Sequence, residues 1–214
     1  MPLTDVQLIE SATLPYLLSV PDGEPPADGW PVLCFLHGYD EGAPMPIRKA
    51  LTIHGPLNPG NPEQVRQTFI VLAPQMPSKG DRWYRFAEAV RDIVAQVQKH
   101  HDGDRTRTYL TGFSFGGNGV FDLVLSQTDL WAALWPVDLT RVPQADPQRP
   151  IWISIGEVTR RATPAFINML GLVSAEVSLE GDRLYLDQGQ DHVGAARLAY
   201  RDMRIYEWLL ARRL

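Results

Sequence analysis

The chain has 214 residues, of which 44% are hydrophobic and 21% are charged. Such a composition is ordinary for a globular protein, and this length can bury one large core, so we expect a single domain over residues 1–214. The formal net charge of −5 and the lack of a long basic run give no reason to expect nucleic acid or an anionic membrane surface as a partner.

The N-terminal segment has no basic region followed by an apolar one, and no apolar stretch is long enough to span a bilayer. A cytoplasmic protein is therefore expected. Cys34 is the one cysteine and lies in the apolar run VLCFL, where a buried structural thiol is the expected state.

Short apolar runs recur along the chain, and several of them are continuously apolar rather than alternating. Continuous runs are typical of strands covered on both faces in a parallel sheet. We expect strands within 14–20, 31–38, 68–75, 107–112, 131–138, 150–157 and 183–189.

Segments of helical character lie between these runs. The segment 117–127 is apolar enough for a buried helix. Apolar residues stand at helical spacing in two further places, at Val90, Ile93, Val94 and Val97, and at Ile205, Trp208 and Leu209. Strand–helix alternation predicts an α/β fold with a mostly parallel central sheet and helices on both faces. In such sheets, ligands bind at the carboxyl ends of the strands.

The stretch LTGFSFGGNGV at 110–120 places one serine among glycines, where an expected strand meets an expected helix. Gly112, Ser114 and Gly116 match the motif G-x-S-x-G. In a nucleophile elbow the serine takes a strained conformation between strand and helix, and small neighbours avoid collisions there. The motif therefore predicts Ser114 as a nucleophile, and the alternative is a glycine-rich turn without chemistry.

A nucleophilic serine of this kind also requires two backbone N–H groups that hold the oxyanion of the intermediate. The residue after the nucleophile, Phe115, supplies one of them. The loop that follows the run FLHG supplies the other, and Tyr39 is the expected donor. His37 in the same run is expected to support this loop by hydrogen bonding.

The chain has five histidines from which a general base could come. His100 and His101 close an expected helix, where exposed positions are typical, and His54 lies in a long loop upstream of the serine. In hydrolases with the elbow motif the chain order is serine, acid, then histidine. Only His192 lies downstream of Ser114, so His192 is the expected base.

These elements together resemble the α/β-hydrolase superfamily over nearly the whole chain. Within it, the chain looks most like the phospholipase/carboxylesterase-like group, which includes small bacterial esterases and predicted peptidases. The matching segments are LPYLLSVP, FLHGYDEG, HGP at 54–56, VLAPQMP, TRTYLTGFSFGGNG, PIWISIGE and AYRDMRIYEWLL. The resemblance implies hydrolysis of carboxylic esters or thioesters by a Ser-His-Asp triad without a cofactor.

The chain departs from the family at the triad acid. The family carries an aspartate in the loop after the strand PIWISIGE, typically three residues after its glycine, and here that position is Thr159. Asp138 ends the preceding strand, where some hydrolases of this fold carry the acid, and Glu157 lies in the usual loop. We favour Asp138 over Glu157, and an acid such as Asp187, or no acid partner, remains an alternative.

The substrate is less constrained than the catalytic residues. Tyr39, Trp83 and Phe115 would line the mouth of the site and bind an apolar or aromatic part of the substrate, although aromatic residues there could equally be core packing. The Pro- and Gly-rich segment 40–67 could form a cap over the serine or a plain long loop.

The expected activity is that of a serine hydrolase acting on small carboxylic esters. The alternatives are a thioesterase, peptidase or acyltransferase using the same residues, or a non-catalytic binding protein with an incomplete triad. No pair of histidines or carboxylates has metal-ligand spacing, so neither a metal nor another cofactor is expected. The partner would be a small-molecule ester, and the oligomeric state is left open.

Overall fold

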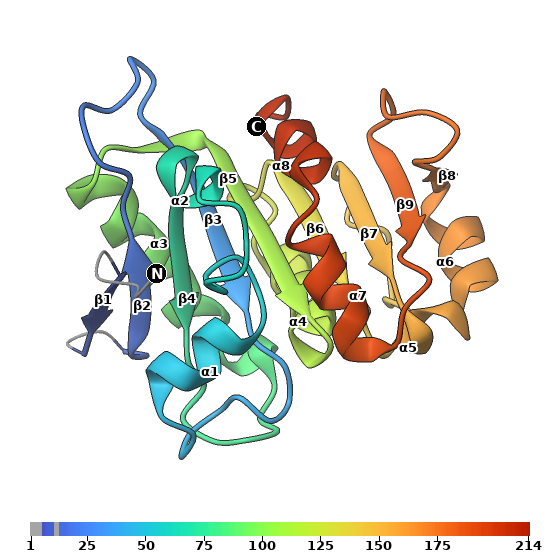
Figure 1. Ribbon diagram of the computed structural model, residues 1–214, viewed down its shortest axis with the longest axis horizontal. Helices are drawn as coiled ribbons and strands as arrows, with labels where there is room; N and C mark the ends of the chain where they lie inside the picture. The colour runs from blue at the N-terminus through green and yellow to red at the C-terminus, as the bar shows by residue number, and fades with distance from the viewer. Residues whose placement is uncertain (1–5, 11–12) are drawn as a thin grey trace.

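A sheet of nine strands forms the centre of the molecule, with helices packed on both of its faces (Figure 1). The computed structural model describes residues 6–10 and 13–214. In spatial order the strands are β1 (Val6–Ile9), β2 (Tyr16–Ser19), β4 (Ile70–Pro74), β3 (Trp30–Leu36), β5 (Gly103–Phe113), β6 (Ala133–Val137), β7 (Ile151–Ile155), β9 (Arg183–Asp187) and β8 (Val173–Ser174). The β1–β2 and β2–β4 pairs are antiparallel and all the others are parallel.

The helices divide between the two faces of this sheet. Against one face lie α3 (Ala87–His100), α4 (Phe115–Ser126) and α6 (Thr163–Leu170), and against the other lie α1 (Ile47–Ile53), α2 (Gln64–Thr68), α7 (His192–Ala199) and α8 (Met203–Leu210). Two short elements, the 3-10 helix η1 (Trp83–Phe86) and α5 (Glu157–Arg160), lie in loops. Figure 1 shows α7 and α8 crossing in front of the sheet and α3 behind it.

The two cores explain why the central strands are continuously apolar. In β3, Val32 and Cys34 point into the core beneath α3 and α4, whereas Leu33 and Phe35 point into the core beneath α7 and α8. All four side chains are buried. Burial of both strand faces is what a parallel sheet covered by two helix layers requires.

The predicted fold class, an α/β domain with a mostly parallel sheet, is confirmed. Each of the seven expected strands overlaps an observed strand, and the three expected helices are α3, α4 and α8. The sequence analysis missed β1, the two-residue β8 and the helices α1, α2, α5, α6 and α7. Within the described ranges, no helix combines the length and the apolar character that crossing a bilayer demands.

The segment 40–67 contains α1 and α2 rather than continuous loop. Ala50 and Leu51 of α1 and Val65 of α2 are buried in the core on the α7 and α8 side of the sheet. The segment is thus packed onto the domain through apolar contacts. Its action as a cap over the serine stays a prediction.

Candidate active site

Ser114 occupies the single residue between the last residue of β5 and the first residue of α4. Its backbone angles are φ 56° and ψ −117°, a region that costs energy for a residue with a side chain. A Cβ on Gly116 would lie 1.9 Å from the carbonyl oxygen of Leu36, and one on Gly112 would lie 2.3 Å from that of Gly116. Glycine is therefore required on both sides of Ser114 by close backbone approach.

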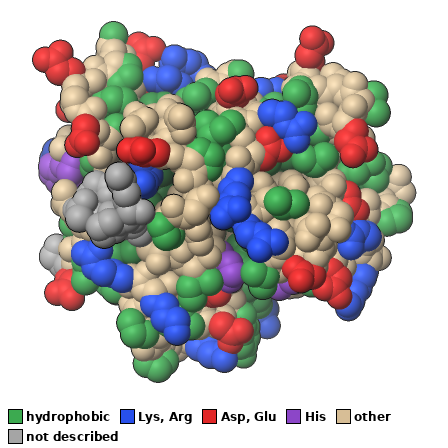
Figure 2. All heavy atoms as spheres, in the orientation of Figure 1, with side chains coloured by type: hydrophobic (Ala, Val, Ile, Leu, Met, Phe, Trp, Pro, Cys, Tyr) green, Lys and Arg blue, Asp and Glu red, His purple; other side chains and the backbone are tan. Residues whose placement is uncertain are grey.

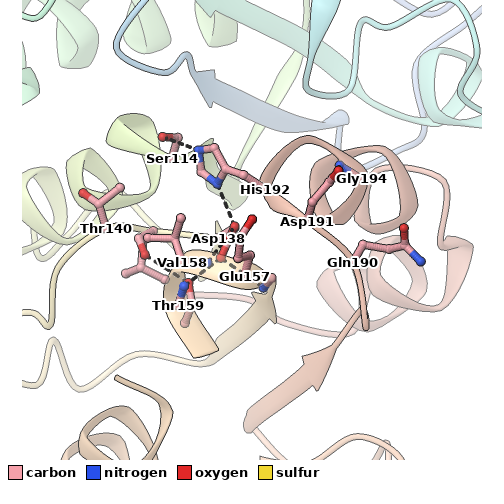
Figure 3. A network of polar contacts seen from close by, with 12 residues as sticks. Ser114, Asp138, Thr140, Glu157, Val158, Thr159, Gln190, Asp191, His192 and Gly194 are labelled. Carbon is pink, nitrogen blue, oxygen red and sulfur yellow. Dashed lines mark hydrogen bonds and ion pairs between the residues drawn. The ribbon is translucent and has the colours of Figure 1, made fainter. Parts of the chain in front are cut away.

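A chain of two hydrogen bonds connects Ser114 to Asp138 through His192 (Figure 3). The Ser114 Oγ–H donates to His192 Nε2 over 2.8 Å, and His192 Nδ1–H donates to Asp138 Oδ2 over 2.6 Å. His192 is the first residue of α7 because Asp191 caps this helix and accepts from the Gly194 amide over 2.6 Å. The cap fixes the backbone that carries the imidazole.

Asp138 directly follows β6, and its side chain is fully buried. Its Oδ1 accepts backbone N–H groups from Gly156 over 3.0 Å and from Thr159 over 2.8 Å. Burial works to raise the pKa of Asp138, but the hydrogen bonds from His192 and Thr159 outweigh it and hold this pKa below its usual value. Asp138 is thus an ionised acceptor aimed at His192.

The other two carboxylates considered for this role point elsewhere. Glu157 is half exposed and lies 3.8 Å from Arg161. Asp187 forms a two-pronged ion pair with Arg160, with distances of 2.6 and 2.7 Å. Of the three carboxylates, the structure therefore brings Asp138 alone to His192.

The two residues expected to hold the oxyanion lie side by side next to the serine. The rings of Tyr39 and Phe115 make an edge contact with 5.6 Å between centroids. Phe115 is the first residue of α4, and N–H groups in a first helical turn have no partner inside the helix. The Tyr39 N–H has no hydrogen-bond acceptor among the described residues. Both amides can therefore serve a ligand, and their role as donors stays a prediction.

His37 holds the loop that carries Tyr39. Its Nδ1–H donates to the Gly38 carbonyl over 2.7 Å and its Nε2 accepts the Met76 N–H over 3.0 Å. Burial lowers the pKa of His37 to about 4, so the ring is neutral at pH 7. The expected supporting role of His37 matches these contacts.

Trp83 stands behind this loop rather than at the mouth of the site. Its side chain is 1% exposed, and its Nε1–H donates to the His37 carbonyl over 3.1 Å. Its ring also fills the space that a Cβ on Gly119 would need, at 2.5 Å. Through these contacts Trp83 supports the loop that carries Tyr39. Direct binding of substrate by Trp83 stays a prediction.

Two residues beside the serine were not among the expected site residues. His54 lies at the end of α1 with its ring 4.8 Å from that of Phe113 and its Nε2 3.7 Å from a Glu41 carboxylate oxygen. Burial, with a smaller effect of His192, lowers the pKa of His54 to about 4, and burial raises the pKa of Glu41. Glu41 stands in the segment DEG and His54 in the segment HGP, and both segments belong to the family resemblance. That resemblance is the sequence feature that could have pointed to these two residues.

These residues surround a cleft of about 130 Å³ at the carboxyl ends of β3 and β5. The cleft is lined by Gly38, Tyr39, Asp40, Glu41, His54, Phe113, Ser114, His192 and Val193. Among the described residues, no group of three or more His, Cys, Asp or Glu side chains is arranged to hold a metal ion.

No protein-family model matches the sequence, and no curated protein matches it either. Solved structures do match. A thermostable esterase superposes on 98% of the chain with a TM-score of 0.74 and 22% identity, and this chain spans 63% of that esterase's length. An S-formylglutathione hydrolase from Agrobacterium tumefaciens superposes on 97% of the chain and 94% of its own length, with a TM-score of 0.67 and 14% identity.

The protein has the α/β-hydrolase fold. A third structure, the feruloyl esterase module from Clostridium thermocellum complexed with sinapinate, agrees over 94% of the chain and 87% of its own length, with a TM-score of 0.65 and 11% identity. The α/β-hydrolase resemblance inferred from the motifs is confirmed for the fold. At these identities the match concerns the fold, and the chemistry of this protein has to be argued from its own residues.

Proposed function

We propose that the protein is a serine hydrolase that cleaves small carboxylic esters through an acyl-enzyme on Ser114. The hydrogen-bond chain from Ser114 Oγ through His192 to Asp138 Oδ2 carries this proposal. A nucleophile, a base and a buried acid in this order are the arrangement that activates a serine hydroxyl.

In the first half of the reaction Ser114 Oγ attacks the ester carbonyl carbon and its proton passes to His192 Nε2. The oxyanion that forms is held by the Tyr39 and Phe115 amides. The bond to the alcohol oxygen then breaks, and His192 gives its proton to that oxygen. In the second half His192 takes a proton from water, which attacks the acyl carbon. The bond from that carbon to Ser114 Oγ then breaks, and His192 returns the proton to Oγ, which releases the acid and restores the Ser114 hydroxyl.

Asp138 would serve this cycle by orienting His192 and stabilising its positive charge. Its backbone hydrogen bonds, from Gly156, Val158 and Thr159, hold the carboxylate in place. All of these steps use groups of the chain itself, so the proposal includes no cofactor. A cytoplasmic location and a small-molecule ester as partner are parts of the same proposal.

The size of the cleft supports a small substrate. Pockets for drug-sized ligands have volumes of roughly 300–1,000 Å³, and the cleft at Ser114 has about 130 Å³. A short acyl group fits such a space, with the exposed Tyr39 ring at its edge. Short-chain esters are therefore the substrates to test first. Thioesterase, peptidase and acyltransferase activities would use the same residues and differ in the leaving or accepting group.

A fluorophosphonate probe and p-nitrophenyl acetate and butyrate test the proposal. We expect labelling and turnover by the native protein, and the loss of both in Ser114→Ala. Ser126→Ala is the matched control, because Ser126 lies at the far end of α4 and bonds the Leu123 carbonyl. A folded native protein that neither reacts with the probe nor hydrolyses either ester would refute the proposal and favour a non-catalytic binding protein.

A further inference from the structure

A second cleft of about 210 Å³ adjoins the cleft at Ser114. His54 and Val193 line both of them, so the two spaces meet at these side chains. The second cleft lies between α7 and the segment that follows α1, to which Gly55 and Asn58 belong. A molecule bound at Ser114 would reach it by passing the exposed Val193 side chain.

The second cleft combines an apolar interior with two cationic side chains. Ile53, Val193, Ala196 and the Tyr200 ring supply apolar surface, and Arg197 and Arg201 complete the lining. No aspartate or glutamate lines it. The cleft therefore fits a ligand with an apolar body and an anionic group.

Arg197 and Arg201 have no partner of their own within the described part of the chain. Both are exposed, and neither guanidinium group makes a hydrogen bond or an ion pair with another described residue. By contrast, Arg204, in the following helix α8, pairs with Asp202 at 2.6 Å. Figure 2 shows Lys and Arg side chains together near the middle of this face, over the region of α7. The two guanidinium groups are free to bind an anion.

The side of the serine on which this cleft opens indicates which part of an ester would enter it. Val193 directly follows His192 in α7, and the base must reach the leaving oxygen in order to protonate it. The leaving alcohol therefore lies on the His192 side. The pair Tyr39 and Phe115, which is expected to bind the oxyanion, makes no part of the second cleft.

We propose that the second cleft binds the alcohol part of the substrate, and that Arg197 and Arg201 select alcohols that carry a carboxylate. The substrate class is thus an ester of a small acid with a hydroxy acid, aromatic or aliphatic. This inference rests on the proposed function, because it needs Ser114 and His192 to act on an ester. Nearby acidic groups do not oppose it: Asp40 is paired with Lys79, and the Glu41 carboxylate faces His54.

Matched pairs of substrates that differ only in charge test the selection. We suggest 3-acetoxybenzoate against 3-acetoxybenzamide, and 3-(3-acetoxyphenyl)propionate against its amide, with acetic acid release followed by pH-stat. We expect a higher kcat/KM for the carboxylate of at least one pair. Arg197→Gln and Arg201→Gln should each reduce that preference by roughly threefold to tenfold, with little change for the amide. The preference should also fall as salt rises, because exposed charges are screened.

Arg105→Gln is the matched control for the lost charge. Arg105 is exposed and lies near the start of β5, about 26 Å along the strand from its serine end, so its replacement should leave the preference unchanged. Equal hydrolysis of acids and amides by the native protein, or an unchanged preference in both arginine variants, would refute this inference and leave the esterase proposal intact. Failure to hydrolyse any of the four esters, together with no fluorophosphonate labelling, would refute both.

Discussion

Replacement of Asp138 by Asn tests whether this carboxylate orients His192. The Asn carbonyl can keep the place of Oδ1 and accept the Gly156 and Thr159 amides, at 3.0 and 2.8 Å. Its NH₂ group then takes the place of Oδ2, 2.6 Å from His192 Nδ1. Because an amide nitrogen donates, Nδ1 must become the acceptor and the proton moves to Nε2. An Nε2 that carries a proton cannot accept one from Ser114.

The expected loss is large because the wrong tautomer removes the general base. In the Ser-His-Asp enzymes of the chymotrypsin type the corresponding Asp→Asn change lowers kcat by about 10⁴, and we expect a loss of roughly 10³ to 10⁴ here. Such a loss corresponds to about 4–5.5 kcal/mol in the activation free energy. The free energy of unfolding should change far less, because the Gly156 and Thr159 hydrogen bonds remain and the side chains have similar volume. The backbone hydrogen bond that is lost, from the Val158 N–H to Oδ2, is long at 3.4 Å.

The measurement is kcat and KM for p-nitrophenyl acetate, with urea denaturation as the check on folding. Glu157→Gln is the matched control variant. Glu157 is half exposed and forms an ion pair with Arg161 at 3.8 Å. Because an exposed ion pair contributes little, kcat should stay within about twofold of the native value. Similar mild losses in both variants, or a larger loss in Glu157→Gln, would refute the assignment of Asp138 as the acid.

Two further predictions concern the support of the site. A Cβ on Gly156 would lie 2.7 Å from the Asp138 carboxylate, so Gly156→Ala should displace that group, lower kcat tenfold or more and cost roughly 1–3 kcal/mol in urea denaturation. Gly181→Ala, where the nearest atom is a Leu184 methyl at 3.2 Å, should do neither. The pKa values of His37 and His54 are lowered to about 4, so the unfolded chain binds more protons between pH 4 and 6.5 and stability must rise with pH there. Urea denaturation should show the highest free energy of unfolding above pH 6.5, and the contribution of His37 should fall by about 3 kcal/mol by pH 4. The pH dependence should be weaker in His54→Gln. A free energy of unfolding that does not change with pH in the native protein would contradict this prediction.

The central strands and long helices could be predicted because each carries its own pattern. A strand such as β3 is buried on both faces, so Val32 to Leu36 are all apolar, and α3 shows an apolar stripe from Ala87 to Val97. The missed elements lack such patterns. The two residues of β8 form a strand only through their partners in β9. The buried residues of α7 are glycine and alanine, which give little apolar pattern. Tertiary contacts, rather than local pattern, stabilise these elements.

The same distinction applies to the site. Ser114 could be proposed from the sequence because an elbow demands glycines at fixed neighbouring positions, and His192 because the chain order leaves one histidine downstream. Glu41 and His54 stand in motifs of the resemblance, but their approach of 3.7 Å beside the serine joins residues that are separate in the sequence, and no local pattern predicts it. The neighbours that line the second cleft, Arg197 among them, likewise become visible only when α7 and the segment after α1 are packed together.

The unexpected residue at the family's acid position is explained by where Asp138 lies. Neighbouring parallel strands are about 4.8 Å apart, and β6 pairs with β7, so a carboxylate after β6 can reach a histidine that faces the end of β7. Such a carboxylate is buried and needs hydrogen bonds. Thr159 supplies one through its N–H and directs its own hydroxyl to the Leu139 carbonyl over 3.0 Å. An aspartate at position 159 would place a second negative charge beside the first. Thr159 is therefore compatible with the proposed role of Asp138 as the acid.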